Sequence, residues 1–591
     1  MPFVSLNKNA VTAMTVLAMM VTGCGDDPAA EADDLSWIDE MPLTPLATPC
    51  SVASGTGFAT ITLATAGESV LVSLRADSAI LVNGEVCALA GVMKKLTITG
   101  GTGADTVIID FLNGTFLAGS TTTANIIIDM VSGTDAFKLR GRNSATTGDV
   151  LTFGAGTAGV VAVNFAADLN KDITVANADT FAVATGNGID TVTGAGGAGT
   201  GAAFTAALSI NGGALVDTLT GGDGADTISG GAGNDTISGG LGADILNGDA
   251  DNDTFNEGAV TNGADTFNGG TGTDTVSYAL RTAIVTVTIA ASGGTADDGE
   301  STETDDVIDD VEVVTGGTLA DTMTCQAAGC TLNGGAGDDI LTGAAGADTL
   351  NGDAGNDTLT GAAGADTLNG GVGDDTFVEG TAASGGDVFN GGAGTDTVDY
   401  SGRSVALLVT MDGVAADDGE SGELDDVNVD VEDLLGGTVA DIITGNLNNN
   451  VITGGTGNDT LSGGAGDDTF RERAVTSGAD SFDGGAGVDT VDYSARVAAL
   501  TVTMDGVAAD DGLSGEIDNV SATVENLLGG TAADTITGNL LDNNIDGGAG
   551  ADTIVGGAGD DILDGAGGTD SVTGGDGDDI CIGETLVTCE L

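Results

Sequence analysis

The sequence predicts an all-β protein, with a parallel β-solenoid in the C-terminal two thirds of the chain and a β-rich N-terminal domain before it. Three observations predict this fold. A nine-residue pattern of glycines, one aspartate and one apolar residue recurs in phase after residue 211. The chain has 102 glycines but only 3% aromatic residues, which favours many small modules over one large aromatic core. No proline follows residue 49, as expected where nearly every backbone N–H joins a parallel ladder.

The first segment, residues 1–24, indicates export. Lys8 precedes the apolar run 11–21, which is too short for a permanent membrane-spanning helix. The run ends in Val-Thr-Gly-Cys24, and this ending resembles a bacterial lipobox. The resemblance implies cleavage before Cys24, a lipid on its thiol and a membrane anchor; a plain secretory signal with an unpaired Cys24 is the alternative. Residues 25–49 are acidic, hold four of the five prolines and are expected to form a linker.

Residues 50–210 are expected to form the N-terminal β domain, because short apolar segments alternate with glycine turns. The stretch 100–107, GGTGADTV, is similar to the later repeats, so this domain is interpreted as a degenerate part of the same solenoid. Lys138, Arg140 and Arg142 alternate onto one strand face. That stripe predicts either a contact with an anionic polysaccharide or a solvated strand face.

After residue 211 the chain alternates between blocks of nonapeptides and a longer segment seen three times. The repeat blocks are expected at residues 211–268, 316–390, 436–483 and 529–591, the last including a C-terminal cap. The long modules are expected at residues 269–315, 391–435 and 484–528. From the first glycine of a module to the next Gly-Gly-Thr the distances are 47, 45 and 45 residues, and 45 is five nonapeptides. The modules are therefore expected to stay in phase with the solenoid.

Charge and composition limit the functions. The chain has 90 acidic residues against 13 basic ones, a formal net charge of −77, which argues against nucleic acid as a partner. It has no histidine, which removes the Ser-His-Asp triad, Cys-His pairs and the HExxH zinc site. An acidic chain of this kind is expected to bind cations.

The repeat GGxGxDxUx, where U is apolar, combines a glycine turn with a minimal strand. The glycines allow a tight turn whose carbonyl groups point inward, the aspartate adds a carboxylate, and the apolar residue points into a narrow core. Nine residues make half a coil, so turns two repeats apart stack and can hold a cation between them. Oxygen ligands without sulfur or imidazole favour calcium over zinc or copper, and a flexible cage favours calcium over magnesium.

These repeats resemble the hemolysin-type calcium-binding repeats of the RTX family. The resemblance implies a right-handed parallel β-roll or β-helix that holds several Ca²⁺ ions, with ligands from the turn carbonyl groups and from the sixth-position aspartate. The implied ligands are Asp226, Asp235, Asp244, Asp253, Asp339, Asp348, Asp357, Asp366, Asp375, Asp459, Asp468, Asp552, Asp561, Asp570 and Asp579. The turns that begin at Cys325, Gly445 and Gly538 lack this aspartate and are expected to bind no metal.

Six cysteines remain besides Cys24, an even number that suits an oxidising compartment. Several pairings are open, and proximity in the chain favours Cys50 with Cys87, Cys325 with Cys330, and Cys581 with Cys589. A disulfide between Cys325 and Cys330 would brace a turn that calcium otherwise holds.

Each long module also carries an Ala-Asp-Asp-Gly tract and a tyrosine three residues before an arginine. This feature predicts either a loop that binds a sugar or a partner, or a solvated hairpin whose arginine offsets nearby carboxylates. The tracts and pairs involve Asp297, Asp298, Asp417, Asp418, Asp510 and Asp511, with Tyr278, Arg281, Tyr400, Arg403, Tyr493 and Arg496.

Together these features predict a calcium-binding, non-catalytic, exported structural protein that folds into a rigid β-roll in extracellular calcium. It is expected to be lipid-anchored to the outer membrane or cell surface, or released outside the cell. One alternative is a calcium-dependent surface adhesin that binds an extracellular polysaccharide or a surface partner. Another is a polysaccharide-modifying enzyme with its site in residues 50–210.

Overall fold

The computed structural model describes most of the chain after residue 50. The described residues are 51–52, 58–63, 69–74, 79–82, 85–89, 95–100, 102–110, 126–132, 134–141, 149–155, 160–165, 173–197, 200–289, 298–325, 329–414, 418–507, 511–583, 585–587 and 589. They form two compact units, the first including residues up to 277 with 302–311, and the second including 278–301 with 312–591. Within the part of the chain that the structure describes, no helix is long and apolar enough to cross a membrane.

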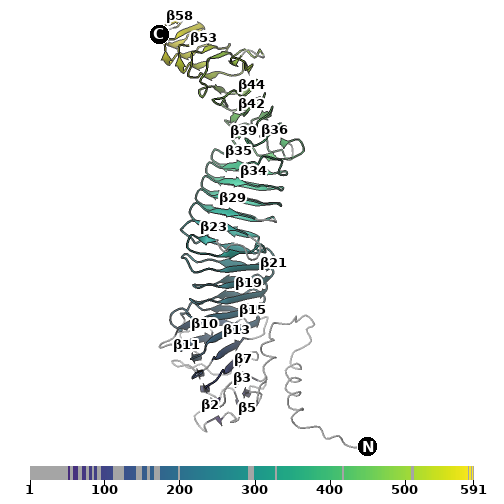
Figure 1. Cartoon of the computed structure of the whole chain (residues 1–591), viewed down its shortest axis with the longest axis vertical. Helices are drawn as coiled ribbons and strands as arrows, with labels where there is room; N and C mark the ends of the chain where they lie inside the picture. The colour runs from purple at the N-terminus through teal and green to yellow at the C-terminus, as the bar shows by residue number, and fades with distance from the viewer. Residues whose placement is uncertain are drawn as a thin grey trace, which may run out of the picture. The chain divides into compact units, whose positions relative to one another are not determined.

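Unit 1 is a parallel β-solenoid in which two ladders alternate along the chain (Figure 1). The first ladder contains β3 (Ser69–Leu74), β7 (Thr106–Asp110), β9 (Ala136–Arg140), β13 (Thr180–Asn187), β15 (Leu208–Ala214), β17 (Thr227–Ala232), β19 (Ile245–Ala250), β21 (Thr266–Thr271) and β25 (Asp306–Val307). Because β13 pairs in parallel with β15, this ladder runs from the N-terminal region into the repeats without a break.

The second ladder of unit 1 contains an insertion. Its parallel strands are β2 (Phe58–Thr62), β6 (Lys95–Thr99), β8 (Ile126–Asp129) and β12 (Ile173–Ala176), then β14 (Thr191–Thr193), β16 (Thr218–Thr220), β18 (Thr236–Ser238), β20 (Thr254–Asn256) and β22 (Thr275–Ser277). Between β12 and β14 lie β10 (Val150–Ala155) and β11 (Val160–Phe165), which join them through two antiparallel pairings and one parallel pairing. The N-terminal region is therefore a solenoid with an inserted antiparallel pair. At its start, β1 (Ser51–Val52) pairs antiparallel with β2, and β4 (Ala79–Val82) pairs antiparallel with β3 and with β5 (Glu85–Leu89).

In unit 2 one ladder is continuous. It contains β23 (Val285–Thr288), β27 (Thr322–Thr324), β29 (Ile340–Thr342), β31 (Thr358–Thr360), β33 (Thr376–Val378), β35 (Thr397–Asp399), β39 (Asp433–Leu435), β41 (Val451–Thr453), β43 (Thr469–Arg471), β45 (Thr490–Asp492), β49 (Asn526–Leu528), β51 (Asn544–Asp546), β54 (Ile562–Asp564) and β57 (Ile580–Ile582). Figure 1 labels β23, β29, β35 and β39 of this ladder in order along unit 2.

The alternate strands of unit 2 form three successive ladders. The first contains β26 (Val313–Thr315), β28 (Thr331–Ala336), β30 (Thr349–Ala354), β32 (Thr367–Val372), β34 (Val388–Ala393) and β38 (Asp426–Val427). The second contains β36 (Leu407–Thr410), β40 (Ile442–Thr444), β42 (Thr460–Ala465), β44 (Ser481–Ala486) and β48 (Asn519–Val520). The third contains β46 (Leu500–Thr503), β50 (Thr535–Thr537), β53 (Thr553–Ala558), β56 (Ser571–Asp576) and β58 (Thr585–Val587).

The long modules cause these breaks. In the second module, β36 pairs antiparallel with β37 (Gly419–Glu420), while β38 closes the preceding ladder. The third module repeats this arrangement with β46 and β47 (Gly512–Leu513), and in the first module β23 pairs with β24 (Gly299–Glu300). The modules therefore keep the solenoid in phase on one sheet only, because the inserted hairpin ends the other sheet and starts a new one. A short pair, β52 (Ala549–Gly550) with β55 (Gly567–Gly568), lies in the last turns.

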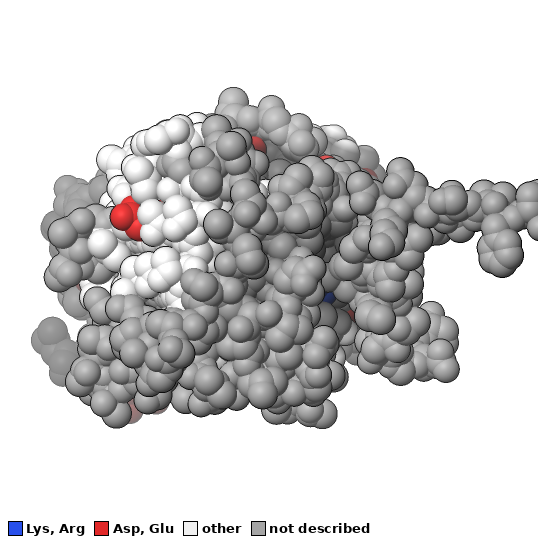
Figure 2. Space-filling view, turned by 90° about the horizontal axis from the view of Figure 1, so that it is seen from below, with Lys and Arg blue, Asp and Glu red and all other residues white. Residues whose placement is uncertain are grey.

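The core is narrow. Each repeat strand contributes one apolar side chain that is fully buried, such as Leu341, Leu350, Leu359 and Leu368. Flanking residues on the same strands are half-buried, which matches the alternation of a strand with one face inside. The described residues on the face seen from below carry few charged side chains (Figure 2). The all-β solenoid that the sequence predicts is confirmed.

Candidate metal centre

The sixth-position aspartates lie in buried rows along the turns. All fifteen predicted ligands are at most 2% exposed. One carboxylate oxygen of each row member accepts the backbone N–H of the residue one coil earlier: Asp339 N–H donates to Asp357 Oδ1 at 2.7 Å, and Asp357 N–H donates to Asp375 Oδ1 at 2.8 Å. The fold therefore brings the predicted aspartates together as continuous ladders of carboxylates.

The second oxygen of most of these aspartates is buried and has no hydrogen-bond partner. This holds for Oδ2 of Asp235, Asp244, Asp253, Asp339, Asp357, Asp366, Asp375, Asp459, Asp468, Asp552, Asp561 and Asp579. A buried carboxylate oxygen without a donor is costly unless a cation or a proton compensates it. The orphaned oxygens therefore fit an oxygen-liganded cation such as calcium.

Asp226 and Asp348 differ from this group. Asp226 Oδ2 accepts the Gly222 N–H at 2.6 Å, and Asp348 Oδ2 accepts the Ala344 N–H at 2.9 Å, within the same turn. Both oxygens of these carboxylates are therefore used by the protein itself. Asp570 Oδ1 accepts the Asp552 N–H at 2.9 Å and so belongs to the same row system.

The turns approach one another closely. Gly335 has φ +100°, and a Cβ there would lie 2.5 Å from the carbonyl oxygen of Gly317, one coil earlier. Only glycine tolerates both the left-handed backbone and this contact. The close approach places turn carbonyl groups beside the next coil, as the predicted carbonyl ligands require.

Burial and like charge both act on the carboxylates. Burial raises the pKa of Asp339 to about 7, with a further increase from Asp357 and Asp321 and an opposing effect of the hydrogen bond from the Asp321 N–H. Burial likewise raises the pKa of Asp244 to about 7 and that of Asp366 to about 6. Rows of this kind are unfavourable when every carboxylate is ionised and no cation is bound.

Sequence reasoning left several members of the same rows out of the ligand set. Asp217, Asp396, Asp480 and Asp489 are buried, and their Oδ2 atoms have no hydrogen-bond partner. Asp396 and Asp489 end the GGxGxD motif that opens the second and third long modules, so the repeat pattern itself was the signal. In the N-terminal region, Asp105 N–H donates to Asp135 Oδ1 at 2.8 Å and Asp190 N–H donates to Asp217 Oδ1 at 2.7 Å. The carboxylate ladder thus extends outside the regular repeats.

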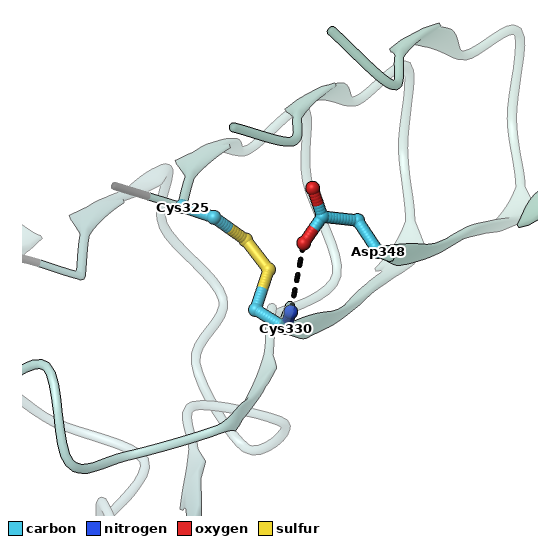
Figure 3. Close-up of side chains that lie close together, drawn as sticks. All are labelled: Cys325, Cys330 and Asp348. Atoms are coloured by element: carbon cyan, nitrogen blue, oxygen red, sulfur yellow. Dashed lines mark hydrogen bonds between the residues drawn. A yellow bond between two sulfur atoms is a disulfide. The ribbon is translucent and has the colours of Figure 1, made fainter. Parts of the chain in front are cut away.

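Cys325, Cys330 and Asp348 lie together, but they do not form a metal site (Figure 3). The two cysteines are joined by a disulfide, with their Cα atoms 6.4 Å apart. Asp348 Oδ1 accepts the Cys330 N–H at 2.8 Å. Cys325 and Cys330 occupy the first and sixth positions of a turn, and in the turn of Gly343 a Cβ at the first position would lie 2.6 Å from the sixth-position carboxylate. Those two positions are neighbours in space, which explains why cysteines placed there can bond.

The other predicted covalent sites have different outcomes. Cys581 and Cys589 form a disulfide with Cα atoms 5.7 Å apart. Cys24 and the Cys50–Cys87 pair lie outside the residues whose side chains the structure describes, as do the signal and linker segments.

The basic stripe of the N-terminal domain is described in part. Lys138 and Arg140 are half-buried, and Arg140 lies 3.9 Å from Asp110, while Arg142 lies outside the described residues.

The tyrosines and arginines of the long modules are buried completely, so neither a solvated hairpin nor an exposed binding loop describes them. Arg403 forms ion pairs with Glu379, with Glu423 at 2.6 Å and with Glu420 at 3.2 Å. Tyr400 donates its hydroxyl hydrogen to Asp425 at 3.0 Å.

The third module repeats the arrangement. Arg496 pairs with Glu472 and Glu516, and Tyr493 donates to Asp518 at 3.1 Å. The second aspartate of the acidic tract is also structural, since Asp418 accepts the Thr410 and Val427 N–H groups. Each of these two modules therefore holds a guanidinium as an internal cation.

The fold and its carboxylate rows define a solenoid whose turns are built to hold hard cations. The family model of the RTX calcium-binding nonapeptide repeat matches residues 211–246, 220–255, 260–278, 331–359, 342–377, 381–402, 435–470, 475–495, 522–554, 537–572 and 556–585. Residues 211–585 therefore contain RTX calcium-binding nonapeptide repeats, and these repeats bind multiple calcium ions. No curated protein matches the chain.

Proposed function

We propose that the protein is an exported, non-catalytic structural element whose repeat blocks fold into a stiff solenoid when calcium binds. The observation that carries this proposal is the set of buried sixth-position aspartates with one oxygen unpartnered, such as Asp357 and Asp375. Without a cation, these carboxylates repel along each row, and a core of one side chain per strand offers little compensation. Calcium binding then supplies free energy of folding.

The calcium ligands are proposed to be the aspartates of these rows together with carbonyl groups of the glycine turns. Extracellular calcium modules typically bind with a dissociation constant of about 10⁻⁴ to 10⁻³ M, so folding follows export into a calcium-rich medium. The disulfides Cys325–Cys330 and Cys581–Cys589 support an oxidising compartment. We place the protein outside the cytoplasm, anchored through a lipid on Cys24.

Two observations favour a structural role over the alternatives. The module residues Tyr400, Arg403, Tyr493 and Arg496 are buried, so these side chains do not form a ligand-binding surface. The chain also has no histidine for acid–base catalysis. Any contact with a surface polysaccharide would use other, exposed parts of the solenoid.

Circular dichroism of residues 25–591 tests the calcium-dependent fold. We expect a reversible transition from coil to β structure as calcium is added, and loss of that structure when a chelator removes it. A β signal that stays unchanged in a sample shown by elemental analysis to be metal-free would contradict the proposal.

Mass spectrometry of the protein isolated from its native membranes tests the anchor. We expect an N-terminal peptide that begins at Cys24 and carries the mass of a lipid. A peptide that retains residues upstream of Cys24, or a Cys24 without lipid, would contradict anchoring while leaving the calcium proposal intact.

A further inference from the structure

One turn departs from the calcium pattern at the same place after every long module. Each module is followed by a Gly-Gly-Thr turn, which begins at Gly316, Gly436 or Gly529. The next turn, nine residues later, begins at Cys325, Gly445 or Gly538 and lacks the sixth-position aspartate. Three departures at one offset indicate a shared role.

In the second copy, Asn450 takes the place of that aspartate and reverses the hydrogen bond between coils. In the ordinary turn before it, Asp441 Oδ1 accepts the Leu407 N–H at 2.9 Å. Asn450 instead donates from Nδ2 to the Glu432 carbonyl oxygen of the preceding coil at 2.9 Å, while its Oδ1 accepts the Asn446 N–H at 2.8 Å. An amide can do both because it carries a donor and an acceptor, whereas a carboxylate only accepts.

Further amides satisfy the neighbouring carbonyl groups. Asn446 donates from Nδ2 to the Val431 oxygen at 2.9 Å, and Asn448 donates from Nδ2 to the Val429 oxygen at 2.9 Å. Asn446 and Asn450 are only 7% and 1% exposed. The carbonyl oxygens that face this turn are thus paired with neutral N–H donors and need no cation.

The third copy repeats this chemistry. Asn543 donates to the Glu525 carbonyl oxygen at 3.0 Å, and Asn539 donates to the Val524 carbonyl oxygen at 2.7 Å. Asn543 Oδ1 accepts the Asn539 N–H at 2.9 Å. In the first copy, the disulfide Cys325–Cys330 closes the corresponding turn covalently. The amide hydrogen bonds and the disulfide thus close a turn at the same position after a module, and neither needs a metal ion to do so.

The second and third modules, which these asparagine turns contact, each hold an internal cation. Arg403 and Arg496 neutralise carboxylates inside them. One of the two sheets ends in each module and a new sheet begins there, with β36 in the second module and β46 in the third. One sheet of each following repeat block therefore has its first strand inside the module. In the second and in the third copy, the buried arginine, the turn closed by asparagine amides and the start of a new sheet therefore occur together.

We propose that the end of the second and of the third long module, together with the two turns that follow it (residues 428–453 and 521–546), forms a calcium-independent seed from which the following repeat block folds when calcium binds. In these seeds Asn450 and Asn543 act in place of a calcium ion. This inference rests on the proposed calcium-dependent folding of the blocks. It assigns to these asparagines a role opposite to that of the aspartates in the same row.

Hydrogen exchange of the whole chain, read by mass spectrometry, tests the seeds. In excess chelator we expect residues 428–453 and 521–546 to stay protected while residues 334–378 exchange at the rates of an unfolded chain. Equal loss of protection in all these segments would overturn the inference and leave the proposed function standing. Persistent protection of residues 334–378 in a metal-free sample would contradict the proposed function, and the inference with it.

Asn450→Asp is the decisive variant, because it places a carboxylate oxygen against the Glu432 carbonyl group. We expect residues 428–453 to exchange at least about tenfold faster than wild type in chelator, since the carboxylate oxygen and the Glu432 carbonyl oxygen then face each other with no donor between them. Calcium should restore protection, with one more calcium ion bound per chain in equilibrium dialysis. Wild-type protection of Asn450→Asp in chelator would overturn the inference.

Asn449→Asp is the matched control. Asn449 is exposed, and its Oδ1 accepts the Asp467 N–H at 2.8 Å, a role that the natural Asp542 fills for Asp560 in the third copy. The control adds the same charge one residue away and should exchange as wild type does. Asn543→Asp is the second, independent variant, and should deprotect residues 521–546 alone; loss of protection in both segments from either single variant would overturn the assignment to individual turns.

Discussion

The backbone N–H of Asp339 donates to Oδ1 of Asp357 one coil later, at 2.7 Å, while Oδ2 of Asp357 is buried without a partner. The Asp357 carboxylate therefore has two roles: one oxygen links adjacent coils, and the other remains available to a cation. This division explains how the same residue can set the stacking of coils and make that stacking depend on calcium.

Asp357→Asn tests the second role, which is the binding of a cation. The amide can still accept the Asp339 N–H through its oxygen, but it removes a negative charge and a potential ligand. We expect fewer calcium ions bound per chain and a loss of about 1–3 kcal/mol in the free energy of unfolding at fixed calcium. Isothermal titration and thermal unfolding measure the two effects.

The control for this variant is Asp338→Asn. Asp338 is exposed, and its Oδ1 accepts the Asn356 N–H at 2.9 Å, which an amide oxygen also does. It should bind as many calcium ions as wild type. If both variants lost the same number of ions, the row position of Asp357 would not be what matters.

The metal-free chain should fold better in acid. Burial raises the pKa values of Asp339 and Asp459 to about 7 in the folded metal-free state, well above the value of about 3.9 for an unfolded aspartate. The folded state therefore binds more protons than the unfolded state between these values. The corresponding stability is fully present below about pH 4 and is lost as pH rises through about 7.

Circular dichroism in chelator checks this dependence. We expect more β structure at pH 5 than at pH 8, and a lower calcium concentration at the folding midpoint at pH 5, because protonation of the rows already stabilises the folded state. A metal-free β signal that rises with pH would contradict the assigned direction.

A structural feature could be predicted from the sequence when the residues that cause it lie close together along the chain. The nonapeptide is local, so the parallel solenoid and the burial of Asp357 follow from a few consecutive residues. The burial of Arg403 does not, because its partners Glu379, Glu420 and Glu423 come from separate segments that only the finished fold brings together. The N-terminal carboxylate ladder was only partly visible: Asp105 ends a GGTGAD motif, but its partner Asp135 lies 30 residues later, not at the 18-residue separation of the later repeats.

Arg403→Met tests the internal cation of the second module. Removing the guanidinium leaves Glu379 and Glu423 buried without their partner, which typically costs about 3–5 kcal/mol. We expect a large loss of thermal stability in saturating calcium. The triple variant with Glu379→Gln and Glu423→Gln should recover part of it, because neutral amides are cheaper to bury than unpaired carboxylates.

Arg471→Met serves as the comparison. The Arg471 side chain is 57% exposed and lies 3.9 Å from Asp492. An exposed pair contributes at most about 1 kcal/mol, so this variant should unfold close to wild type. Equal destabilisation by both arginine variants would show that loss of charge, and not loss of the buried ion pairs, is responsible.

Gly335→Ala tests the close approach of successive turns. The left-handed backbone at φ +100° costs an L-residue about 1–2 kcal/mol, and the new Cβ would also press on the Gly317 carbonyl oxygen at 2.5 Å. We expect a lower unfolding temperature in saturating calcium and a higher calcium midpoint, because the carbonyl groups of the two turns are forced apart.

Gly380→Ala provides the control, since no atom lies within 4 Å of its added Cβ, and it should change the unfolding free energy by less than about 0.5 kcal/mol. If Gly335→Ala lowered stability without moving the calcium midpoint relative to this control, the backbone strain would be real but the turn spacing would not govern calcium binding.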